Sequence, residues 1–261
     1  MIEVSGKQKE TVNMPATYMQ RVDGKQGTGR QGIHVFLNDD QFALLQTIMT
    51  WKKVKAGNTL FMEGEEAGQL YYIRSGRIKL RKSTEDGKEL ILTIQRKGDV
   101  IGDFGGFGSE DYNSTAETAD ACEVGVIQVK ELEGLIAKHG DLGLQFVKWY
   151  NLKQRIMESR FRDLLLYGKA GALASTLIRA CNTCGTQDED GITLSMKLNH
   201  TELGEMIGAT RESVNRMLNS FKEQGILETK EGKIVVRNLE DLRFLCGCPE
   251  QGHCPNEICR L

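Results

Sequence analysis

The chain has 261 residues, of which 39% are apolar and 27% charged, a composition that is ordinary for a globular protein with two modest hydrophobic cores. No apolar run approaches the roughly 20 residues that a membrane-spanning helix needs, and the N-terminus lacks the apolar core of a secretion signal, so a cytoplasmic protein is expected. The formal net charge of -2 excludes nucleic-acid binding through bulk positive charge, and any such binding must rest on cations placed on one face.

The N-terminal half of the chain changes character near residue 35. Residues 1–34 are polar and rich in glycine, with little periodicity that could bury a core, and they are expected to form a flexible extension. Residues 35–140 contain short segments rich in β-branched and aromatic residues, such as LYYIRSG and ELILTIQRKG, separated by glycines. This pattern is typical of a small antiparallel β-barrel or sandwich, in which glycine provides the positive φ angles of tight turns.

Residues 141–168 are expected to form one long helix that joins two domains. The stretch contains no proline and repeats apolar side chains at helical spacing: Leu142, Phe146, Trp149, Leu152, Ile156, Met157, Phe161, Leu164 and Leu165. A continuous helix of this length extends roughly 39 Å at about 1.5 Å per residue, and Gly168 is expected to end it. The wide apolar stripe can pack on the N-terminal domain or pair two subunits.

Two short helices are expected to meet at Gly208-Ala209, within residues 169–240. The first has Asn199 or Thr201 as a side-chain acceptor at its start, with Glu202 three residues after Asn199. The second places one apolar stripe against the first helix and the domain core: Val214, Met217, Leu218 and Phe221. This order of elements indicates a helix-turn-helix.

The opposite face of the second helix carries side chains that suit the major groove of DNA. Arginine forks onto guanine O6 and N7, and glutamate accepts from the cytosine amino group. The side chains expected to contact DNA are Arg211, Glu212, Asn215, Arg216 and Thr201. Residues 225–237 follow with alternating apolar and polar positions about Glu231-Gly232, which predicts a β-hairpin wing.

Four of the seven cysteines lie in the tail formed by residues 241–261: Cys246, Cys248, Cys254 and Cys259. Cysteines of a cytoplasmic protein are more often thiols or metal ligands than disulfides. A segment this rich in Cys, Pro and Gly has no core of its own, but thiolates that converge on a metal would fold it. Their spacing is not the paired CxxC of a zinc ribbon, and thiolates also suit iron-sulfur clusters, so the tail is expected to bind a metal or a cluster.

The run Arg211-Glu212-Ser213-Val214-Asn215-Arg216 resembles the recognition helix of the cyclic-AMP receptor protein/Fnr superfamily of bacterial transcription regulators, which the chain resembles along most of its length. The resemblance implies an α+β fold with an N-terminal β-roll like the cyclic-nucleotide-binding jelly roll, a long dimerisation helix and a C-terminal winged helix-turn-helix. It also implies a homodimer that binds an inverted repeat in DNA, with RNA polymerase as a partner. The spacing Arg-Glu-x-x-x-Arg matches the cyclic-AMP receptor type more closely than the Fnr type, so TGTGA-like half-sites are expected.

Residues 102–114 lie where nucleotide-binding members of this superfamily hold a cyclic phosphate. Those members supply a glutamate for the ribose and an arginine for the phosphate, and the matching positions here are Asp103 and Asn113. A buried phosphodiester without its guanidinium partner would be an unpaired charge, which costs several kcal/mol. No cyclic nucleotide is therefore expected to bind, and the roll is expected to act as a scaffold.

The segments Cys254-Pro-Asn-Glu-Ile-Cys259 and FRDLLLYGK, residues 161–169, resemble the Fnr-type oxygen-sensing regulators of Gram-positive bacilli, which hold a [4Fe-4S] cluster with C-terminal cysteines. The resemblance implies a regulator of the anaerobic response that senses oxygen, or nitric oxide, through such a cluster. That branch has a cysteine where this chain has Gln251, so the expected sulfur ligands are Cys248, Cys254 and Cys259. The fourth ligand is expected to be Cys246 or Asp163, with His253 as a further option.

Two other functions fit parts of the sequence. One is a regulator of the same fold that contains structural zinc and senses a small ligand in the roll. The other is a thiol redox protein that uses Cys181 and Cys184, which have CxxC spacing, whereas Cys122 is expected to be a small buried apolar residue. Because the sequence contains no Ser/His/Asp set, Walker loop or dinucleotide fingerprint, an enzyme is not expected.

Overall fold

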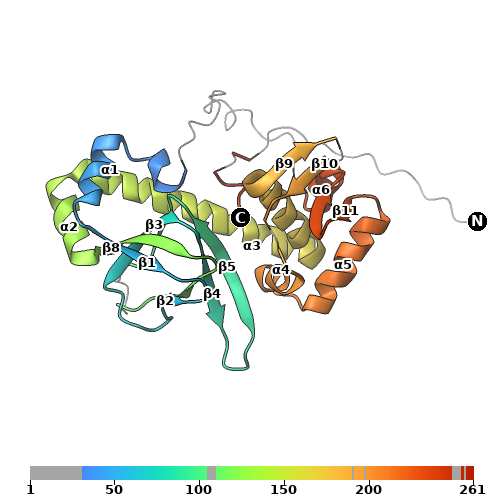
Figure 1. Cartoon of the computed structure of the whole chain (residues 1–261), viewed down its shortest axis with the longest axis horizontal. Coiled ribbons are helices and arrows are strands. Elements are labelled where there is room, and N and C mark those ends of the chain that lie inside the picture. The colour runs from blue at the N-terminus through green and yellow to red at the C-terminus, as the bar shows by residue number, and fades with distance from the viewer. Residues whose placement is uncertain (1–30, 105–109, 190, 197, 249–253, 256) are drawn as a thin grey trace, which may run out of the picture.

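The computed structural model of the protein describes residues 31–261 except 105–109, 190, 197, 249–253 and 256. Figure 1 shows a β-rich N-terminal part, a long helix α3 that passes along it, and a C-terminal part in which helices surround a small sheet. Residues 1–30 of the expected flexible extension lie outside the described residues.

The N-terminal part is a β-roll of two antiparallel sheets, with strand orders β1-β8-β3-β6 and β2-β7-β4-β5. The strands are β1 (Met49–Val54), β2 (Thr59–Phe61), β3 (Gln69–Ser75), β4 (Arg77–Ser83), β5 (Glu89–Arg96), β6 (Val100–Ile101), β7 (Thr115–Thr118) and β8 (Cys122–Gln128). Gly76 turns the chain between β3 and β4 with φ 86°, and a Cβ at this position would lie 2.5 Å from the Cys122 Sγ. Only glycine fits this turn.

Side chains from both sheets fill the core of the roll: Val54, Phe61, Tyr71, Ile73, Ile78, Leu80, Ile101, Ala116 and Val124. A second hydrophobic cluster lies on the outer face of the sheet β1-β8-β3-β6. This face is covered by α1 (Asp39–Gln46), α2 (Val129–Lys138) and the first half of α3. Trp149 of α3 is fully buried in this second cluster. The long helix is therefore part of the fold of the roll and does not merely connect two domains.

The sequence predicts a flexible extension up to residue 34, but residues 31–34 are packed against the roll. A short 3-10 helix, Gly32–Val35, buries Ile33 completely, and the Ile33 amide donates to the Gly98 carbonyl at 2.8 Å. Gly32 has φ 63°, and a Cβ there would lie 2.1 Å from the Gly98 oxygen. The anchoring partner lies far along the chain, which explains why local periodicity did not indicate it.

Helix α3 (Gly140–Cys184) contains 45 residues, but Gly168 inside it has non-helical angles of φ 60° and ψ −166°. The helix is thus interrupted at the glycine where the sequence places its end. Before Gly168, several apolar side chains of α3 are exposed: Leu144, Val147, Met157, Phe161, Leu165 and Leu166. Among the described residues, no helix combines the length and apolarity needed to cross a membrane.

The C-terminal part contains α4 (His200–Ile207), α5 (Arg211–Glu223) and α6 (Leu239–Leu245). Its sheet has the order β11-β12-β10-β9, from β9 (Gly185–Asp188), β10 (Gly191–Leu194), β11 (Leu227–Lys230) and β12 (Lys233–Val236). Its core joins the second half of α3 to α4 and α5 through Leu173, Leu177, Ile178, Leu203, Ile207, Val214, Leu218 and Phe221.

The β11–β12 hairpin turns at Glu231 and Gly232, which both have positive φ angles, 51° and 76°. Positive φ at both central residues is typical of the two-residue turns that suit twisted hairpins. The fold class expected from the sequence is confirmed: an α+β protein with an N-terminal β-roll, a long helix and a C-terminal winged helix-turn-helix.

Candidate nucleic-acid interface and metal centre

The turn between α4 and α5 is tight because two glycines permit close backbone contact. Gly208 is left-handed, with φ 62° and ψ 39°, and ends α4. A Cβ on Gly204 would lie 2.5 Å from the Ala209 carbonyl oxygen, so a larger residue at position 204 would separate the two helices. This close approach sets the angle at which α5 leaves α4.

Both helices of the pair have N-terminal caps, and the first is the Asn199 cap that the sequence predicts. The Asn199 side chain accepts from the Glu202 amide at 2.8 Å, and the Glu202 carboxylate accepts from the Asn199 amide at 3.3 Å. The Thr210 hydroxyl accepts from the Ser213 amide at 3.2 Å and starts α5. The caps fix the N-terminal turn of α5, from which a recognition helix contacts bases.

The two faces of α5 differ as the sequence indicates. Its buried residues are Val214, Leu218 and Phe221, and Met217 is partly buried. The four candidate base-contacting residues of α5 are all exposed: Arg211, Glu212, Asn215 and Arg216. Thr201, near the start of α4, is exposed as well. Arg216 also donates to the Ser213 hydroxyl at 3.3 Å. The face that could enter a major groove is therefore not packed against the protein.

The β-roll contacts the helix-turn-helix beside this face. Lys79 of β4 forms an ion pair with Glu202 of α4 at 2.6 Å, and both side chains are mostly buried. An open groove between the roll and α4 is lined by Lys79, Arg81, Glu89, Thr201 and Arg211, among others. Sequence reasoning did not find Lys79, because no local pattern links a strand of the roll to a helix more than a hundred residues later.

Cys246 directly follows α6, and three cysteines of the tail pack in the core that contains the second half of α3. Cys246 is fully buried, Cys248 and Cys259 are half-buried, and Cys254 is exposed. The suggested ligand His253 and the position Gln251 lie outside the described residues. The fold thus packs three of the four tail cysteines that the sequence singles out, Cys246, Cys248 and Cys259, in one core.

Electrostatic effects among the thiols show how close they lie. The Cys246 thiol donates to the Arg243 carbonyl at 3.5 Å, and its interaction with the Cys248 thiol lowers the pKa of Cys248 below its usual range and raises that of Cys246. Burial raises the pKa of Cys259, Arg179 lowers it, and the Cys254 and Cys248 thiols raise it. The sulfur atoms of the tail therefore share one local environment.

Asp163 of α3 lies beside these thiols and is 2% exposed. One carboxylate oxygen accepts from Arg162 at 2.6 Å, and the other accepts from Arg179 at 2.9 Å and from the Ser175 hydroxyl. Because both oxygens are engaged, Asp163 could bind a metal only by giving up one of these partners. Its observed contacts hold two arginines close to the cysteines.

The donor set of cysteine thiols beside arginines suits in its chemistry an anionic, thiolate-bound centre. Among the described residues, no three His, Cys, Asp or Glu side chains are arranged to hold a metal ion. A cluster bound by cysteine thiolates carries negative charge, and its properties depend on nearby charges and hydrogen bonds. Arg162 and Arg179 provide compensating cations, and both lower the pKa of Cys248.

The remaining cysteines have the environments of structural thiols. Burial raises the pKa of Cys181 to about 12, so its thiolate is scarce at neutral pH. The Cys184 thiol contacts the Ala180 carbonyl at 3.2 Å. Cys122 is buried in the roll, and burial raises its pKa as well. These environments disfavour a thiol redox centre at Cys181 and Cys184.

At the position of the family's cyclic phosphate, Asp103 accepts from the Asn113 amide at 2.9 Å, and Asn113 accepts from Lys82 at 3.0 Å. Sequence reasoning did not find Lys82, which places a cation beside Asn113. However, Lys82 is paired with Glu63 at 2.7 Å. The positive charge beside Asn113 is therefore already compensated by a carboxylate.

Two family models match the chain. A cyclic nucleotide-binding domain model matches residues 51–139, and a Crp-like helix-turn-helix domain model matches residues 171–245. Among solved structures, a CooA mutant from Carboxydothermus hydrogenoformans has a TM-score of 0.69 and 21% identity and covers 84% of this chain and 97% of its own. FixK2 from Bradyrhizobium japonicum has a TM-score of 0.64 and 21% identity, with coverages of 76% and 97%. At these identities the likeness shows the fold alone.

Curated relatives extend the likeness from fold to family. The "Anaerobic regulatory protein" of Bacillus subtilis is 39% identical over 227 residues, which cover 86% of this chain and 94% of that protein. The "cAMP-activated global transcriptional regulator CRP" of Salmonella typhimurium is 28% identical over 186 residues, with coverages of 70% and 88%. By their names the first is a regulatory protein and the second a transcriptional regulator, in agreement with the expectation that this chain is not an enzyme. The chain therefore belongs to the Crp/Fnr family of transcription regulators, which bind DNA as dimers.

Proposed function

We propose that this regulator controls the anaerobic response by sensing oxygen through a [4Fe-4S] cluster bound to its tail. The observation that carries the proposal is the packing of Cys246, Cys248 and Cys259 in one core with the second half of α3, where Arg179 is paired with the buried Asp163. The likeness to the Bacillus subtilis anaerobic regulatory protein supports the anaerobic role. Nitric oxide is a second candidate signal, because it also reacts with such clusters.

The proposed ligands are Cys248, Cys254 and Cys259, with Cys246 or Asp163 as the fourth. A bound cluster would supply the oxygen-sensitive chemistry. The chain's own residues order the tail, exclude water from Cys246 and compensate the charge of the thiolates through Arg162 and Arg179. The tail packs on α3, so binding of a cluster depends on how the domains are arranged. A bound cluster would favour the arrangement of the domains in which the ligands fit it, by the difference between its binding free energies in that arrangement and in the alternative one.

The DNA target proposed for the dimer is an inverted repeat with TGTGA-like half-sites. Two recognition helices must lie about 34 Å apart to enter successive major grooves, so the pairing of subunits determines the half-site spacing. The exposed apolar face of α3, which includes Leu144, Val147, Phe161 and Leu165, is the proposed pairing surface. RNA polymerase is the proposed protein partner of the DNA-bound dimer.

The test compares DNA binding before and after the loss of the cluster. Protein purified without oxygen is expected to be brown, to contain iron and acid-labile sulfide, and to change its affinity for the repeat after exposure to air. Fluorescence anisotropy with a labelled duplex measures the affinity. Removing iron anaerobically with a chelator is the control, and it should match exposure to air. An unchanged affinity after the colour has bleached would rule out the cluster as the sensor.

Cyclic AMP is expected to produce no heat of binding and no change in DNA affinity. The roll has Asn113 where a phosphate-binding member has arginine, and the neighbouring Lys82 is already paired with Glu63. A phosphate without a cationic partner at this position would be unfavourable. Isothermal titration calorimetry at neutral pH provides the measurement, and binding in the micromolar range would contradict the prediction.

A further inference from the structure

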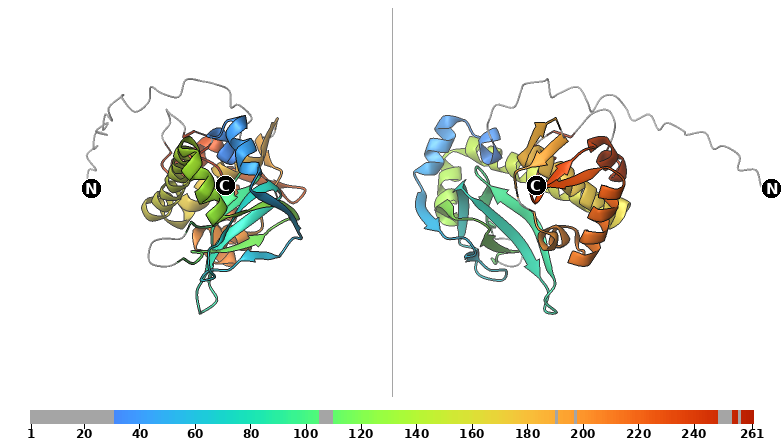
Figure 2. Two further views of the ribbon diagram at one scale, coloured as in Figure 1. Left: turned by 90° about the vertical axis from the view of Figure 1, so that its left-hand side faces the viewer. Right: turned by 45° about the vertical axis from the view of Figure 1, so that its right-hand side comes forward.

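The segment Ile258–Leu261, called here the C-terminal segment, is buried between the β-roll and the C-terminal part. Ile258, Arg260 and Leu261 are 7%, 7% and 5% exposed. In Figure 1 and in the right-hand view of Figure 2 the C-terminus lies in the middle of the molecule, between the roll and the helices of the C-terminal part. The C-terminal segment is thus covered by the elements around it, and Leu261 joins the core of the C-terminal part.

Three hydrogen bonds hold the backbone of the C-terminal segment along the last turns of α3. Arg179 donates to the Ile258 carbonyl at 3.0 Å, Asn182 to the Cys259 carbonyl at 2.9 Å, and the Leu261 amide to the Thr183 hydroxyl at 3.0 Å. The donors and acceptors on α3 are spaced by three and four residues, so they lie on one face of the helix. The segment therefore keeps a defined position next to Cys259.

Arg260 extends from this segment into the β-roll. Its guanidinium forms two hydrogen bonds with the Asp99 carboxylate, at 2.9 and 3.3 Å, and the two side chains are 8% and 1% exposed. Asp99 lies just before β6 and also accepts from the Arg96 amide at 3.0 Å, which fixes its orientation. The Arg260 guanidinium lies 5.9 Å from the ring centroid of Trp149. Two parallel hydrogen bonds between a guanidinium and a carboxylate fix the orientation of both side chains.

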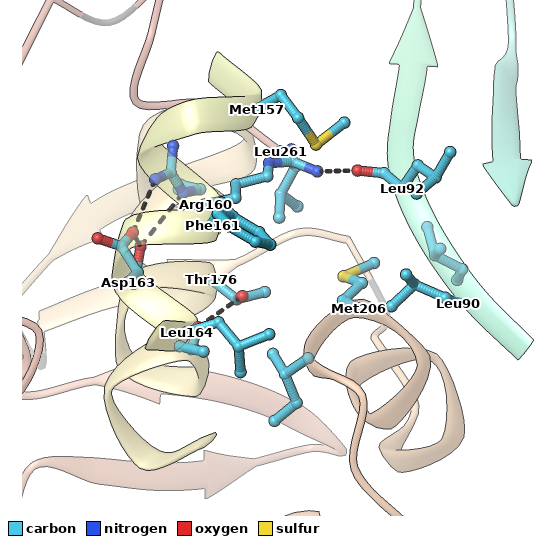
Figure 3. Close-up of a pocket in the computed structure, with 15 residues that line it drawn as sticks. Leu90, Leu92, Met157, Arg160, Phe161, Asp163, Leu164, Thr176, Met206 and Leu261 are labelled. Atoms are coloured by element: carbon cyan, nitrogen blue, oxygen red, sulfur yellow. Dashed lines mark hydrogen bonds and ion pairs between the residues drawn. The ribbon is translucent and has the colours of Figure 1, made fainter. Parts of the chain in front are cut away.

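Arg160 of α3 strengthens the connection between the segment and the roll. It donates to the Leu92 carbonyl of β5 at 2.7 Å and to the Arg260 carbonyl at 3.2 Å. Figure 3 shows Arg160 and Leu261 beside Leu92, at a cavity of about 110 Å³ where α3, β5 and α4 meet. Movement of the C-terminal segment would therefore disturb contacts of the roll as well as contacts of α3.

We propose that the Arg260–Asp99 ion pair couples the cysteine tail to the β-roll. Cys259 directly precedes Arg260, so a change in the position of Cys259 moves the Arg260 guanidinium relative to Asp99. A buried carboxylate that loses its partner becomes an unpaired charge, and the arrangement that keeps the pair is therefore strongly preferred. Arg260 acts as a positioning residue, and this inference rests on the proposed function because it takes Cys259 as a cluster ligand.

The experiment measures how strongly the cluster state affects DNA affinity. Wild-type protein, Arg260→Ala and Arg74→Ala are prepared anaerobically, and each is measured with its cluster and after removal of the cluster by a chelator. Arg74 is a control within the roll and at its surface, where it also pairs with a carboxylate, Glu123 at 3.4 Å, and lies 4.8 Å from the centroid of a tryptophan ring. Iron and sulfide contents are measured in every sample.

The wild type and Arg74→Ala are expected to show a ratio of affinities between the two states of roughly 5 to 150, the usual range of allosteric coupling. Arg260→Ala is expected to contain iron and sulfide like the wild type, but to show a ratio below about 2. Arg260→Lys keeps the charge without the fork and should restore part of the ratio. A merely structural role would lower the affinity of both states and leave the ratio unchanged.

Asp99→Asn provides a second variant that leaves the tail sequence untouched. Asparagine can still accept from the Arg96 amide, so the turn before β6 should be kept while the ion pair is lost. This variant is expected to lower the ratio as Arg260→Ala does, and the double variant should lower it no further. A wild-type ratio in either folded variant would overturn the coupling role of the pair. Absence of iron and sulfide from the wild type would instead overturn the proposed function, and this inference with it.

Discussion

Replacing Cys254 or Cys259 with serine is expected to abolish the binding of iron and acid-labile sulfide, and Cys248→Ser is expected to do the same. The three thiols lie in one environment beside Arg162 and Arg179, and a cluster that loses one thiolate ligand is no longer held. The measurement is the iron and sulfide content of protein prepared anaerobically, together with its visible absorption spectrum.

The matched control for these variants is Cys184→Ser. Cys184 is half-buried and packs against the same core as Cys248 and Cys259, but its thiol contacts the Ala180 carbonyl inside α3. This variant should keep its iron and sulfide. One equivalent of zinc without sulfide in the wild type would contradict the proposed cluster and favour a regulator with structural zinc.

The fourth ligand can be identified by comparing Cys246→Ser with Asp163→Asn. Cys246 is fully buried and interacts with the Cys248 thiol, whereas the Asp163 carboxylate binds Arg162, Arg179 and Ser175. If Cys246 is the fourth ligand, its serine variant loses the cluster and Asp163→Asn keeps it, and the opposite result assigns Asp163. Circular dichroism of each variant separates loss of the cluster from loss of the fold.

Arg211→Ala and Arg216→Ala are each expected to weaken binding to the specific repeat by roughly 1–3 kcal/mol and to relax preference at one base pair. Both side chains are exposed on the N-terminal half of α5, where each can fork onto a guanine, and the exposed Glu212 can accept from a cytosine. Selection from random duplexes with anaerobic protein measures the preferred motif, and anisotropy measures the affinity.

Lys222→Ala is the control for a change of charge without loss of base contacts. Lys222 lies in the last turn of α5, away from the end that would enter the groove. Its removal should weaken all sequences alike and reduce the salt dependence. Selected motifs without symmetric TGTGA halves, or an unchanged motif for Arg216→Ala, would show that other residues read the bases.

The sequence alone predicted those features that depend on residues close together in the chain. The capping pair Asn199 and Glu202, the turn at Glu231-Gly232 and the apolar stripe of α5 are all local patterns. Each depends on backbone geometry that repeats within a few residues, and a sequence therefore displays it directly. The break in the long helix at Gly168 belongs to the same class, because glycine readily leaves the helical conformation.

The tertiary structure alone decided which distant side chains meet. The ion pairs of Arg260 with Asp99 and of Lys79 with Glu202 join residues more than a hundred positions apart, and the burial of Ile33 depends on Gly98. The structure also showed that both oxygens of Asp163 are already engaged, although the sequence marked this residue only as a possible ligand. Such contacts depend on how helices and sheets pack in space, and a lone arginine or aspartate carries no local pattern that names its partner.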